Sequence, residues 1–342
     1  MKIRENVPLS ELTTMRLGGP ARFVIDVENQ DDVPAAFAFA KDRNLPFFIL
    51  GGGANTIAKD AGFDGVIIRN AISGITTYPS SINASSVAGP VQMLIMGGTP
   101  WDTAVAFACE RDLTGIEALS KIPGLSGAAP VQNIGAYGQD ISQTFESAYV
   151  YDTKDQAFKT LEKSDFGFSY RKSILNTTEP NRYFVISITL VLHQGEMPRP
   201  FYNSIERYIA EHGITDFSPQ SIRDIVSHIR ADKLPDPKVK PSAGSFFKNI
   251  YLTEEAAAAA EAKGYPVYHG HDGLKINSGW LIEQCDLKGE LLHGIRVNPK
   301  AALVLINESA TSYQDLAAAR AEIINKVQAK FGFTLEQEPV EL

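Results

Sequence analysis

Short apolar runs and alternating apolar positions predict several strands in the first half of the chain. Residues 22–27 (RFVIDV) are strand-like, and residues 47–50 (FFIL) form a short apolar run that ends at three glycines. Similar strands are predicted at 65–68 and 91–96, and the longest strand candidate is 183–192 (YFVISITLVL). The first half is therefore expected to be rich in β-structure, with glycine-containing loops between the strands.

Helical spacing of apolar residues predicts the helices. Asp31 and Asp32 are suitable caps for a helix to about residue 43, in which Val33, Phe37 and Ala40 share one face. The same reasoning predicts helices at 103–111, 221–230, 253–263 and 312 to about 330.

The last two helices carry clear end signals. Thr253 is placed as an N-cap with Gly264 as the stop, and Ser312 with Asp315 resembles a capping box. Residues 194–200 contain two prolines and a glycine and predict a linker. The whole pattern is typical of an α+β protein.

Length and composition narrow the class of protein. A chain of 342 residues favours two or three packed subdomains over a single core. With 44% hydrophobic and 21% charged residues, extensive disorder is excluded. The net charge of -8 argues against nucleic acid or an anionic membrane as the main partner.

The N-terminal sequence, the lengths of the apolar runs and the cysteines narrow the class of protein further. The first fourteen residues lack the apolar core of a secretory signal, and no run of about eighteen apolar residues is present. Cys109 and Cys285 do not form a CxxC pair, so we expect two reduced thiols and no cysteine-based metal site. The sequence therefore predicts a soluble, intracellular protein without a membrane partner.

Two glycine-rich segments are the first candidates for chemistry. The segment 50–56 (LGGGANT) follows a predicted strand, where glycines allow backbone N–H groups to approach a phosphate. It is not a Rossmann fingerprint, because Thr56 stands where the third glycine belongs, and no GK[ST] motif occurs. A tight turn would explain this segment equally well. A second permissive stretch, 121–138, favours a dinucleotide whose pyrophosphate lies across several loops.

Individual side chains permit both functional and ordinary interpretations. Arg171 could bind a carboxylate in bidentate fashion or be a solvated surface residue. Ser245 could be a proton donor in a dry apolar pocket or a turn hydroxyl, and no histidine nearby suggests a hydrolytic triad. His269 and His271 lack a third ligand within reach, so no metal site is expected. Trp101 and Trp280 are predicted to be packing residues.

Seven segments together resemble one known family. In chain order they are 50–56 (LGGGANT), 121–138 (KIPGLSGAAPVQNIGAYG), 168–173 (FSYRKS), Arg230 with 233–238 (KLPDPK), 244–249 (GSFFKN), 279–289 with GWLIE and LKG, and the tail 335–338. They resemble the UDP-N-acetylenolpyruvoylglucosamine reductases, also called UDP-N-acetylmuramate dehydrogenases. The resemblance extends from about Thr13 to Glu338.

This resemblance implies a fold and a domain organisation. The expected fold is α+β, with an FAD-binding PCMH-type (vanillyl-alcohol-oxidase-like) domain at 17–195, formed by subdomains at about 1–72 and 73–195. A C-terminal α+β substrate-binding domain would occupy 196–334. The tail 335–342 would carry a catalytic glutamate.

The resemblance also implies an activity. Such an enzyme uses FAD and NADPH to reduce UDP-N-acetylglucosamine-enolpyruvate to UDP-N-acetylmuramate. Hydride would come from flavin N5 and a proton from Ser245, while Arg171 and Glu338 stabilise the developing negative charge. It would be a monomeric bacterial enzyme of peptidoglycan synthesis, and so of cell wall biogenesis, cell shape and cell division.

The resemblance implies binding residues as well. Those for FAD are Leu50, Gly51, Gly52, Gly53, Ala54, Asn55, Thr56, Ile122, Pro123, Gly124, Gly127, Asn133, Gly135, Ala136, Tyr137 and Gly138. Those for substrate are Tyr170, Tyr202, Arg230, Lys233 and Asn249. Lys248 would add positive charge near a diphosphate or nicotinamide cofactor.

Two departures and two alternatives remain open. Glu336 and Glu341 could replace Glu338 in a shifted register of the tail. Ala301 stands where family members often have a polar residue, for which Lys300 could compensate. The alternatives are a flavoprotein oxidase or dehydrogenase acting on a sugar or hydroxy acid, and a non-catalytic nucleotide-sugar binder.

Overall fold

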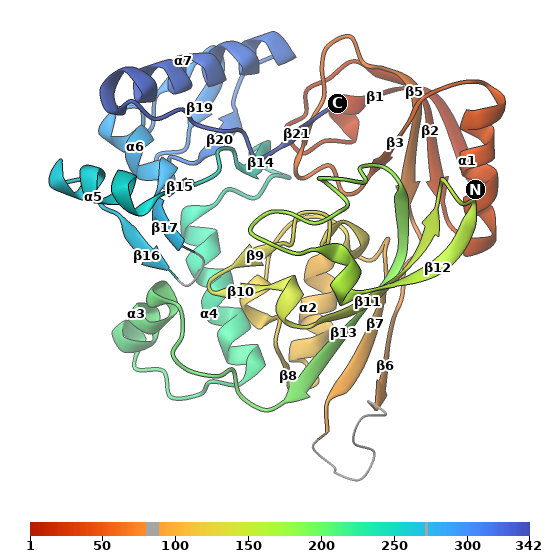
Figure 1. The fold of residues 1–342 in the computed structure, drawn as a ribbon, viewed down its shortest axis with the longest axis horizontal. Helices are drawn as coiled ribbons and strands as arrows, with labels where there is room; N and C mark the ends of the chain where they lie inside the picture. The colour runs from red at the N-terminus through yellow and green to blue at the C-terminus, as the bar shows by residue number, and fades with distance from the viewer. Residues whose placement is uncertain (80–88, 271–272) are drawn as a thin grey trace. The chain divides into compact units, whose positions relative to one another are not determined.

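The computed structural model describes residues 1–79, 89–270 and 273–342. These residues form two compact units, which we describe separately (Figure 1). Unit 1 comprises residues 1–6, 21–52 and 64–230, and unit 2 comprises residues 7–20, 53–63 and 231–342.

The first layer of unit 1 is a four-stranded sheet with one covering helix. Its strand order is β1 (Lys2–Pro8), β2 (Pro20–Val27), β5 (Phe63–Asn70) and β3 (Phe47–Leu50), with β3 and β5 parallel. Helix α1 (Val33–Asp42) buries Val33, Phe37 and Ala40, the three residues whose spacing predicted it. The ring of Phe37 lies 5.1 Å from that of Phe47 and 5.8 Å from that of Phe184. This aromatic contact joins α1 to both sheets of the unit.

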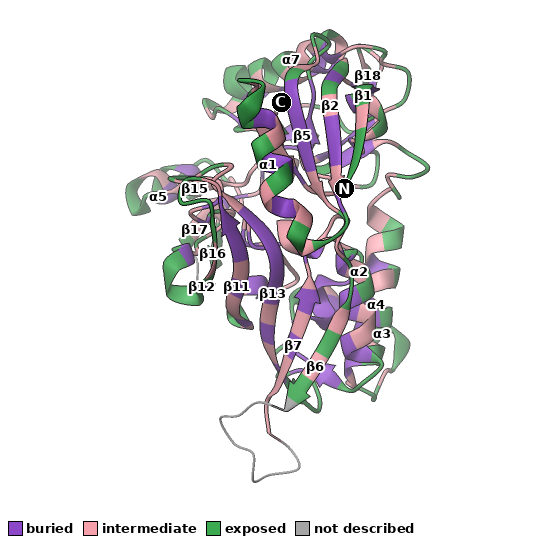
Figure 2. Cartoon of the chain, turned by 90° about the vertical axis from the view of Figure 1, so that its right-hand side faces the viewer, coloured by how far each residue is buried: buried purple, intermediate pink, exposed green. Residues whose placement is uncertain are grey.

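The second layer of unit 1 is a larger antiparallel sheet. Its order is β12 (Ala157–Glu162), β11 (Phe145–Asp152), β13 (Tyr183–Gln194), β7 (Val91–Met96) and β6 (Ile75–Pro79), with β8 (Leu113–Thr114) paired to the end of β13. The central strands β11 and β13 are buried along much of their length, while the edge strand β6 has exposed residues (Figure 2). The long apolar run at 183–192 is therefore a central strand, as predicted.

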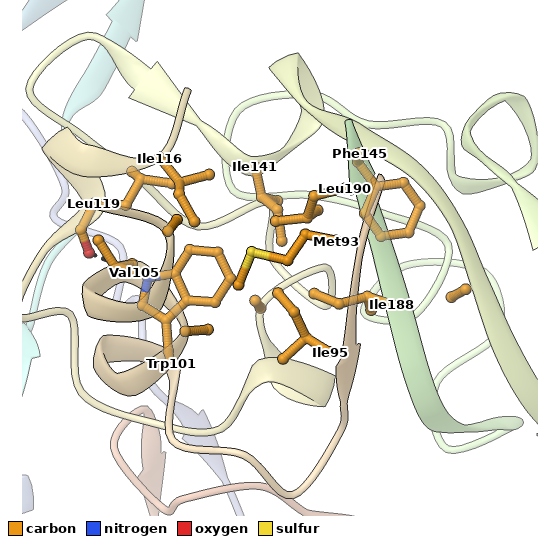
Figure 3. Close-up of a cluster of buried hydrophobic side chains, with 14 of the residues drawn as sticks. Met93, Ile95, Trp101, Val105, Ile116, Leu119, Ile141, Phe145, Ile188 and Leu190 are labelled. Atoms are coloured by element: carbon orange, nitrogen blue, oxygen red, sulfur yellow. Dashed lines mark hydrogen bonds between the residues drawn. The ribbon is translucent and has the colours of Figure 1, made fainter. Parts of the chain in front are cut away.

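Helix α2 (Trp101–Cys109) covers this sheet. Trp101 is fully buried beside Met93 and Val105, and its Nε1–H donates to the carbonyl of Leu119 at 3.1 Å (Figure 3). The predicted start at residue 103 was two residues late. The helix begins directly after Pro100, which occupies its N-cap position.

Two further helices complete unit 1. Helix α4 (Pro219–Lys233) buries the predicted face of Ile222, Ile225, Val226 and Ile229. Helix α3 (Asn203–His212) packs in the same cluster and was not predicted. The expected linker at 194–200 is irregular beyond Gln194, but Met197 is buried in this cluster, so the segment is packed rather than free.

Unit 2 has small sheets covered by helices. One sheet has the order β14 (Ser242–Ser245), β20 (Val304–Asn307), β19 (Ile295–Val297) and β18 (Leu291–Leu292), and a second has the order β15 (Ile250–Leu252), β17 (Gly273–Ile276) and β16 (Tyr268–Gly270). Helices α5 (Glu254–Ala262), α6 (Ser278–Gln284) and α7 (Tyr313–Phe331) enclose one hydrophobic cluster, and β4 (Thr56–Ile57) pairs in parallel with β21 (Val340–Glu341).

The predicted helix caps were partly right. Thr253 caps α5 through its side chain, and Ser312 with Asp315 forms the expected capping box of α7. The acidic caps of α1 were wrong, because Asp32 makes no side-chain cap bond. Its carboxylate instead accepts a hydrogen bond from the N-terminal amine of Met1 at 2.6 Å.

Neither the cysteines nor the helices contradict the class expected from composition. Cys109 and Cys285 are both free, and burial raises the pKa of the Cys109 thiol to about 12. None of the helices in the described ranges combines the length and apolar character needed to cross a membrane.

One partly buried ion pair fastens α4 within unit 1. Arg223 donates to both carboxylate oxygens of Asp102, at 2.7 and 3.1 Å, and to the hydroxyl of Ser120 at 2.9 Å. The backbone N–H of Lys121 also donates to Asp102, at 2.7 Å. Burial by itself would raise the pKa of Asp102, but these hydrogen bonds hold that pKa well below its ordinary value.

We predict that Asp102→Asn destabilises unit 1 in a pH-dependent manner. At neutral pH the substitution should lower the free energy of unfolding by about 2 kcal/mol, because Arg223 loses its charged partner. Since the folded-state pKa of Asp102 lies below the unfolded value of about 3.9, its contribution is complete above that value and is lost as the pH falls below it.

Urea unfolding of the wild type and the variant across this pH range would check the prediction. The exposed Glu211, 4.0 Å from Arg207 on α3, supplies the control Glu211→Gln. The control should change stability by less than about 0.5 kcal/mol. If Asp102→Asn lowered the free energy of unfolding by the same amount at the acid end of this pH range as at neutral pH, the prediction would be contradicted.

Candidate functional site

The two predicted glycine loops lie against each other in unit 1. A Cβ atom at Gly52 would lie only 2.9 Å from Cα of Gly124, and one at Gly51 would lie 2.8 Å from Cβ of Ala128. Gly52 and Gly124 thus allow a backbone-to-backbone approach that other residues would prevent.

A third loop, which sequence reasoning missed, contacts the second of these two loops. Gly97, Gly98 and Thr99 follow β7, just as the glycine triplet follows β3. The N–H of Gly127 donates to the carbonyl of Gly97 at 2.9 Å, and the N–H of Ser126 donates to that of Thr99 at 2.8 Å. The signal was present in the sequence, since a glycine pair directly follows the predicted strand at 91–96.

These loops fit a flavin dinucleotide. At Gly124 the backbone has φ of 125°, and no atom lies within 4 Å of the place where its Cβ would be. The chain there presents bare backbone to open space, which a diphosphate can use through N–H groups. Because FAD needs such contacts from several loops, the residues present suit it.

The next predicted segment brings Asn133, Gly135 and Arg171 together. One guanidinium nitrogen of Arg171 donates to the carbonyl of Gly135 at 3.1 Å, and Nδ2 of Asn133 donates to the carbonyl of Ser169 at 3.3 Å. The guanidinium carbon of Arg171 also lies 5.2 Å from the ring centre of Tyr170. A candidate catalytic residue therefore lies directly against a candidate flavin-binding loop.

Three residues predicted from separate motifs meet in unit 1. The rings of Tyr137 and Tyr202 are edge-to-face with centres 5.9 Å apart, and Tyr137 is hydrogen bonded to Arg230. Burial raises the pKa of Tyr137, and burial lowers the pKa of Arg230. The expected cofactor and substrate residues are therefore contiguous here.

In unit 2, Ser245 ends strand β14 and is exposed. The expectation of a dry apolar pocket around its hydroxyl was wrong for this structure. The pairing of β14 with β20 is irregular between Ser242 and Ser245, where Gly244 has φ of 72°. The buried rings of Phe246 and Phe247 follow, so the apolar residues of this motif serve the core rather than surround the hydroxyl.

The tail places Glu338 beside this motif. The N–H of Glu338 donates to the carbonyl of Phe246 at 2.9 Å, and the N–H of Lys248 donates to that of Glu336 at 2.9 Å. On the other side, the N–H of Val340 donates to the carbonyl of Asn55 at 2.9 Å. The structure thus brings together three sequence-predicted segments, GSFFKN, the end of LGGGANT and the tail.

The two alternative glutamates of the tail are engaged elsewhere. Glu336 forms an ion pair with Lys248, and Glu341 pairs with Arg320 and accepts a hydrogen bond from the hydroxyl of Tyr313 at 2.8 Å. Burial would raise the pKa of Glu341, but Arg320 and Tyr313 lower it overall.

Other predicted residues of unit 2 have structural partners. Oδ1 of Asn249 accepts from the N–H of Ser278 at 3.2 Å, at the start of α6. The carbonyl of Lys233 accepts from Nδ2 of Asn298 at 3.0 Å. Lys300, the suggested substitute for a polar residue at position 301, forms an exposed ion pair with Asp232 at 2.7 Å.

The histidines and tryptophans have ordinary roles. His269 lies 2.9 Å from the carboxylate of Glu261, while His271 lies outside the described residues. Within the described ranges no three histidine, cysteine or acidic residues are grouped as metal ligands would be. Trp101 and Trp280 pack as predicted, the latter against Tyr265 and Phe331.

Comparison with known proteins assigns both parts of the chain. A family model described as an FAD binding domain matches residues 21–154. A model described as UDP-N-acetylenolpyruvoylglucosamine reductase, C-terminal domain, matches residues 236–342.

Full-length relatives agree with these matches. The UDP-N-acetylenolpyruvoylglucosamine reductase of Ralstonia nicotianae is 35% identical over 97% of this chain and 97% of its own length. That of Pseudomonas aeruginosa is 32% identical over 99% of this chain and 98% of its own length.

A solved structure shares the fold. The UDP-N-acetylenolpyruvylglucosamine reductase from Thermus caldophilus superimposes with a TM-score of 0.67 at 23% identity, covering 100% of this chain and 99% of that one. The predicted fold, an α+β flavin-binding fold followed by a C-terminal α+β domain, is therefore confirmed. On this evidence the chain belongs to the family of UDP-N-acetylenolpyruvoylglucosamine reductases.

Proposed function

We propose that this protein reduces the enolpyruvyl group of UDP-N-acetylglucosamine-enolpyruvate to give UDP-N-acetylmuramate, with FAD as cofactor and NADPH as reductant. The observation that carries the proposal is the similarity to curated reductases along nearly the whole chain. The enzyme is an oxidoreductase of peptidoglycan synthesis.

The flavin site is proposed from the glycine-containing loops described above. Residues 50–56, 122–124, 127, 133 and 135–138 are proposed to hold FAD, mainly through backbone groups, as the close approach of Gly52 to Gly124 supports. The missed loop at 97–99 supports the second glycine loop through the hydrogen bonds from Ser126 and Gly127. When bound and reduced by NADPH, the flavin would supply the hydride that reduces the vinyl carbon of the substrate.

Three residues are proposed to carry out the remaining chemistry. Arg171 neutralises negative charge that develops toward the substrate carboxylate, for which a guanidinium is suited because it cannot lose its own charge. Ser245 donates a proton to the carbon that becomes the lactyl centre. Glu338 contributes by carrying a proton or by orienting a donor, the two ways in which a carboxyl group can stabilise an enolate-like charge.

The polar groups proposed for substrate binding are given for each unit by itself. Tyr170, Tyr202 and Arg230 are proposed in unit 1, where the contact of Tyr202 with Tyr137 and the bond of Arg230 to Tyr137 support the assignment. Lys233 and Asn249 are proposed in unit 2. Lys233 supplies positive charge for a diphosphate, and Asn249 supplies amide donors.

The wider role follows from the reaction. We propose a monomeric cytoplasmic enzyme, without membrane or nucleic-acid partners, whose product supports cell shape and division. Residues 17–195 would bind the flavin, residues 196–334 the substrate, and residues 335–342 would supply Glu338.

Two half-reactions test the function directly. Anaerobic NADPH should bleach the visible flavin band of the purified protein, and UDP-N-acetylglucosamine-enolpyruvate should then restore it with formation of UDP-N-acetylmuramate. Bleaching without recovery would favour a flavoprotein oxidase or dehydrogenase. Absence of a flavin band after FAD is supplied would favour the remaining alternative, a non-catalytic nucleotide-sugar binder.

We predict that Ser245→Ala impairs only the second half-reaction. Bleaching by NADPH should remain within about twofold of wild type, while recovery with substrate should slow by at least about 100-fold, since a positioned proton donor contributes on that scale. Ser309→Ala changes an exposed serine of the same unit and should leave both rates unchanged. Equal recovery rates for Ser245→Ala and wild type, measured by stopped flow, would remove Ser245 from the mechanism.

We predict that Glu338→Gln and Glu336→Gln differ sharply. Glu338→Gln should slow recovery by about 100-fold, the usual effect of losing one group that stabilises transition-state charge. Glu336 lies two residues before Glu338 and forms an exposed ion pair with Lys248. Loss of that pair in Glu336→Gln should change the rate of flavin recovery by less than about twofold. The reverse order of effects would show that the tail register assigned here is wrong.

A further inference from the structure

A single side chain of α7 contacts the tail on both sides of Glu338. One guanidinium nitrogen of Arg320 donates to Oε1 of Gln337 at 2.6 Å and also to the carboxylate of Glu341. Gln337 precedes Glu338 by one residue, and Glu341 follows it by three. The hydroxyl of Tyr313, on the same helix, donates to Glu341 at 2.8 Å.

The helix that carries Arg320 is firmly fixed. It has a capping box at its start, and Leu316, Ala319, Ile323 and Val327 are buried in the core of unit 2. The side chain of Arg320 is 24% exposed. A charge-assisted contact in such partly buried surroundings is stronger and better defined than a surface ion pair.

The tail has few apolar anchors of its own near Glu338. Leu335 is buried, but Val340 is 43% exposed, and the backbone bonds of Glu338 and Val340 run to irregular or short segments. A segment with few buried apolar contacts opens easily unless specific polar contacts hold it. Holding Glu338 in one place therefore requires a contact from a rigid element, which α7 provides.

We infer that Arg320 is a positioning residue, which holds the tail through Gln337 and Glu341 so that Glu338 stays beside Phe246 and Ser245. The inference rests on the proposed catalytic role of Glu338. Arg320 acts through the tail and is not itself proposed to touch substrate. Lysine can replace it only in part, because its single nitrogen could reach Gln337 and Glu341 but lacks the second guanidinium nitrogen, which donates to the hydroxyl of Tyr313 at 3.4 Å.

Hydrogen exchange of the flavin-loaded protein gives a readout that does not depend on activity. In Arg320→Ala the amides of Glu338 and Val340 should exchange at least about tenfold faster, since loss of one charge-assisted contact has effects of that order. Arg320→Lys should lie between Arg320→Ala and wild type. Lys326→Ala, which removes the exposed pair with Glu322 on the same helix, is the matched control and should leave tail exchange unchanged.

The half-reactions separate positioning from general stability. Arg320→Ala should slow flavin recovery with substrate by about tenfold or more and leave bleaching by NADPH unchanged, because only the second step depends on Glu338. Unchanged exchange of the tail amides would overturn the inference. Equal slowing of both half-reactions, with faster exchange throughout α7, would also overturn it. If Glu338→Gln left flavin recovery at the wild-type rate, the proposed function of Glu338 would be refuted, whatever the hydrogen exchange of the tail amides showed.

Discussion

The position of Glu338 depends on backbone hydrogen bonds that the last seven residues make on two sides. On one side the tail pairs with residues 246–248, which follow Ser245, and on the other with residues 55–59, which follow the glycine triplet. Both sets use backbone groups of the tail, and in this way the backbone fixes the place of Glu338.

The flavin loops depend on a different constraint, the absence of Cβ atoms. Strands β3 and β7 each lead into a glycine-containing loop, and both loops approach residues 124–128 within backbone contact. Replacing Gly52 would force its loop away from Gly124, and replacing Gly97 would bring a Cβ to 2.4 Å from the side-chain amide of Asn70. The glycines thus define the shape of the site even though they contribute no functional group.

Sequence reasoning found what depends on local pattern and missed what depends on tertiary contact. The face of α4, the central strand β13 and the cap of α7 follow from residue spacing alone, and all were predicted. Helix α3 was missed because only Ile205 and Ile209 of its ten residues are buried, which is too few to mark a face. The loop at 97–99 was missed because its importance lies in what it touches. Motifs located Ser245 and Glu338, but no pattern could show that residue 338 pairs with residue 246.

The two polar clamps, Asp102–Arg223 and Arg320–Glu341, have a common physical purpose. Each joins a well-packed helix to a segment with few apolar residues of its own, the stretch at 120–121 in unit 1 and the tail in unit 2. Apolar packing would stabilise such segments equally well but would tolerate a shift along the helix. Arg223 holds both carboxylate oxygens of Asp102 through two nitrogens, and Arg320 holds Gln337 and Glu341 through one, so each arginine fixes the position of its acceptors rather than simply adding stability. In unit 2 this selects a position for the tail that carries Glu338, on which the proposed reaction depends.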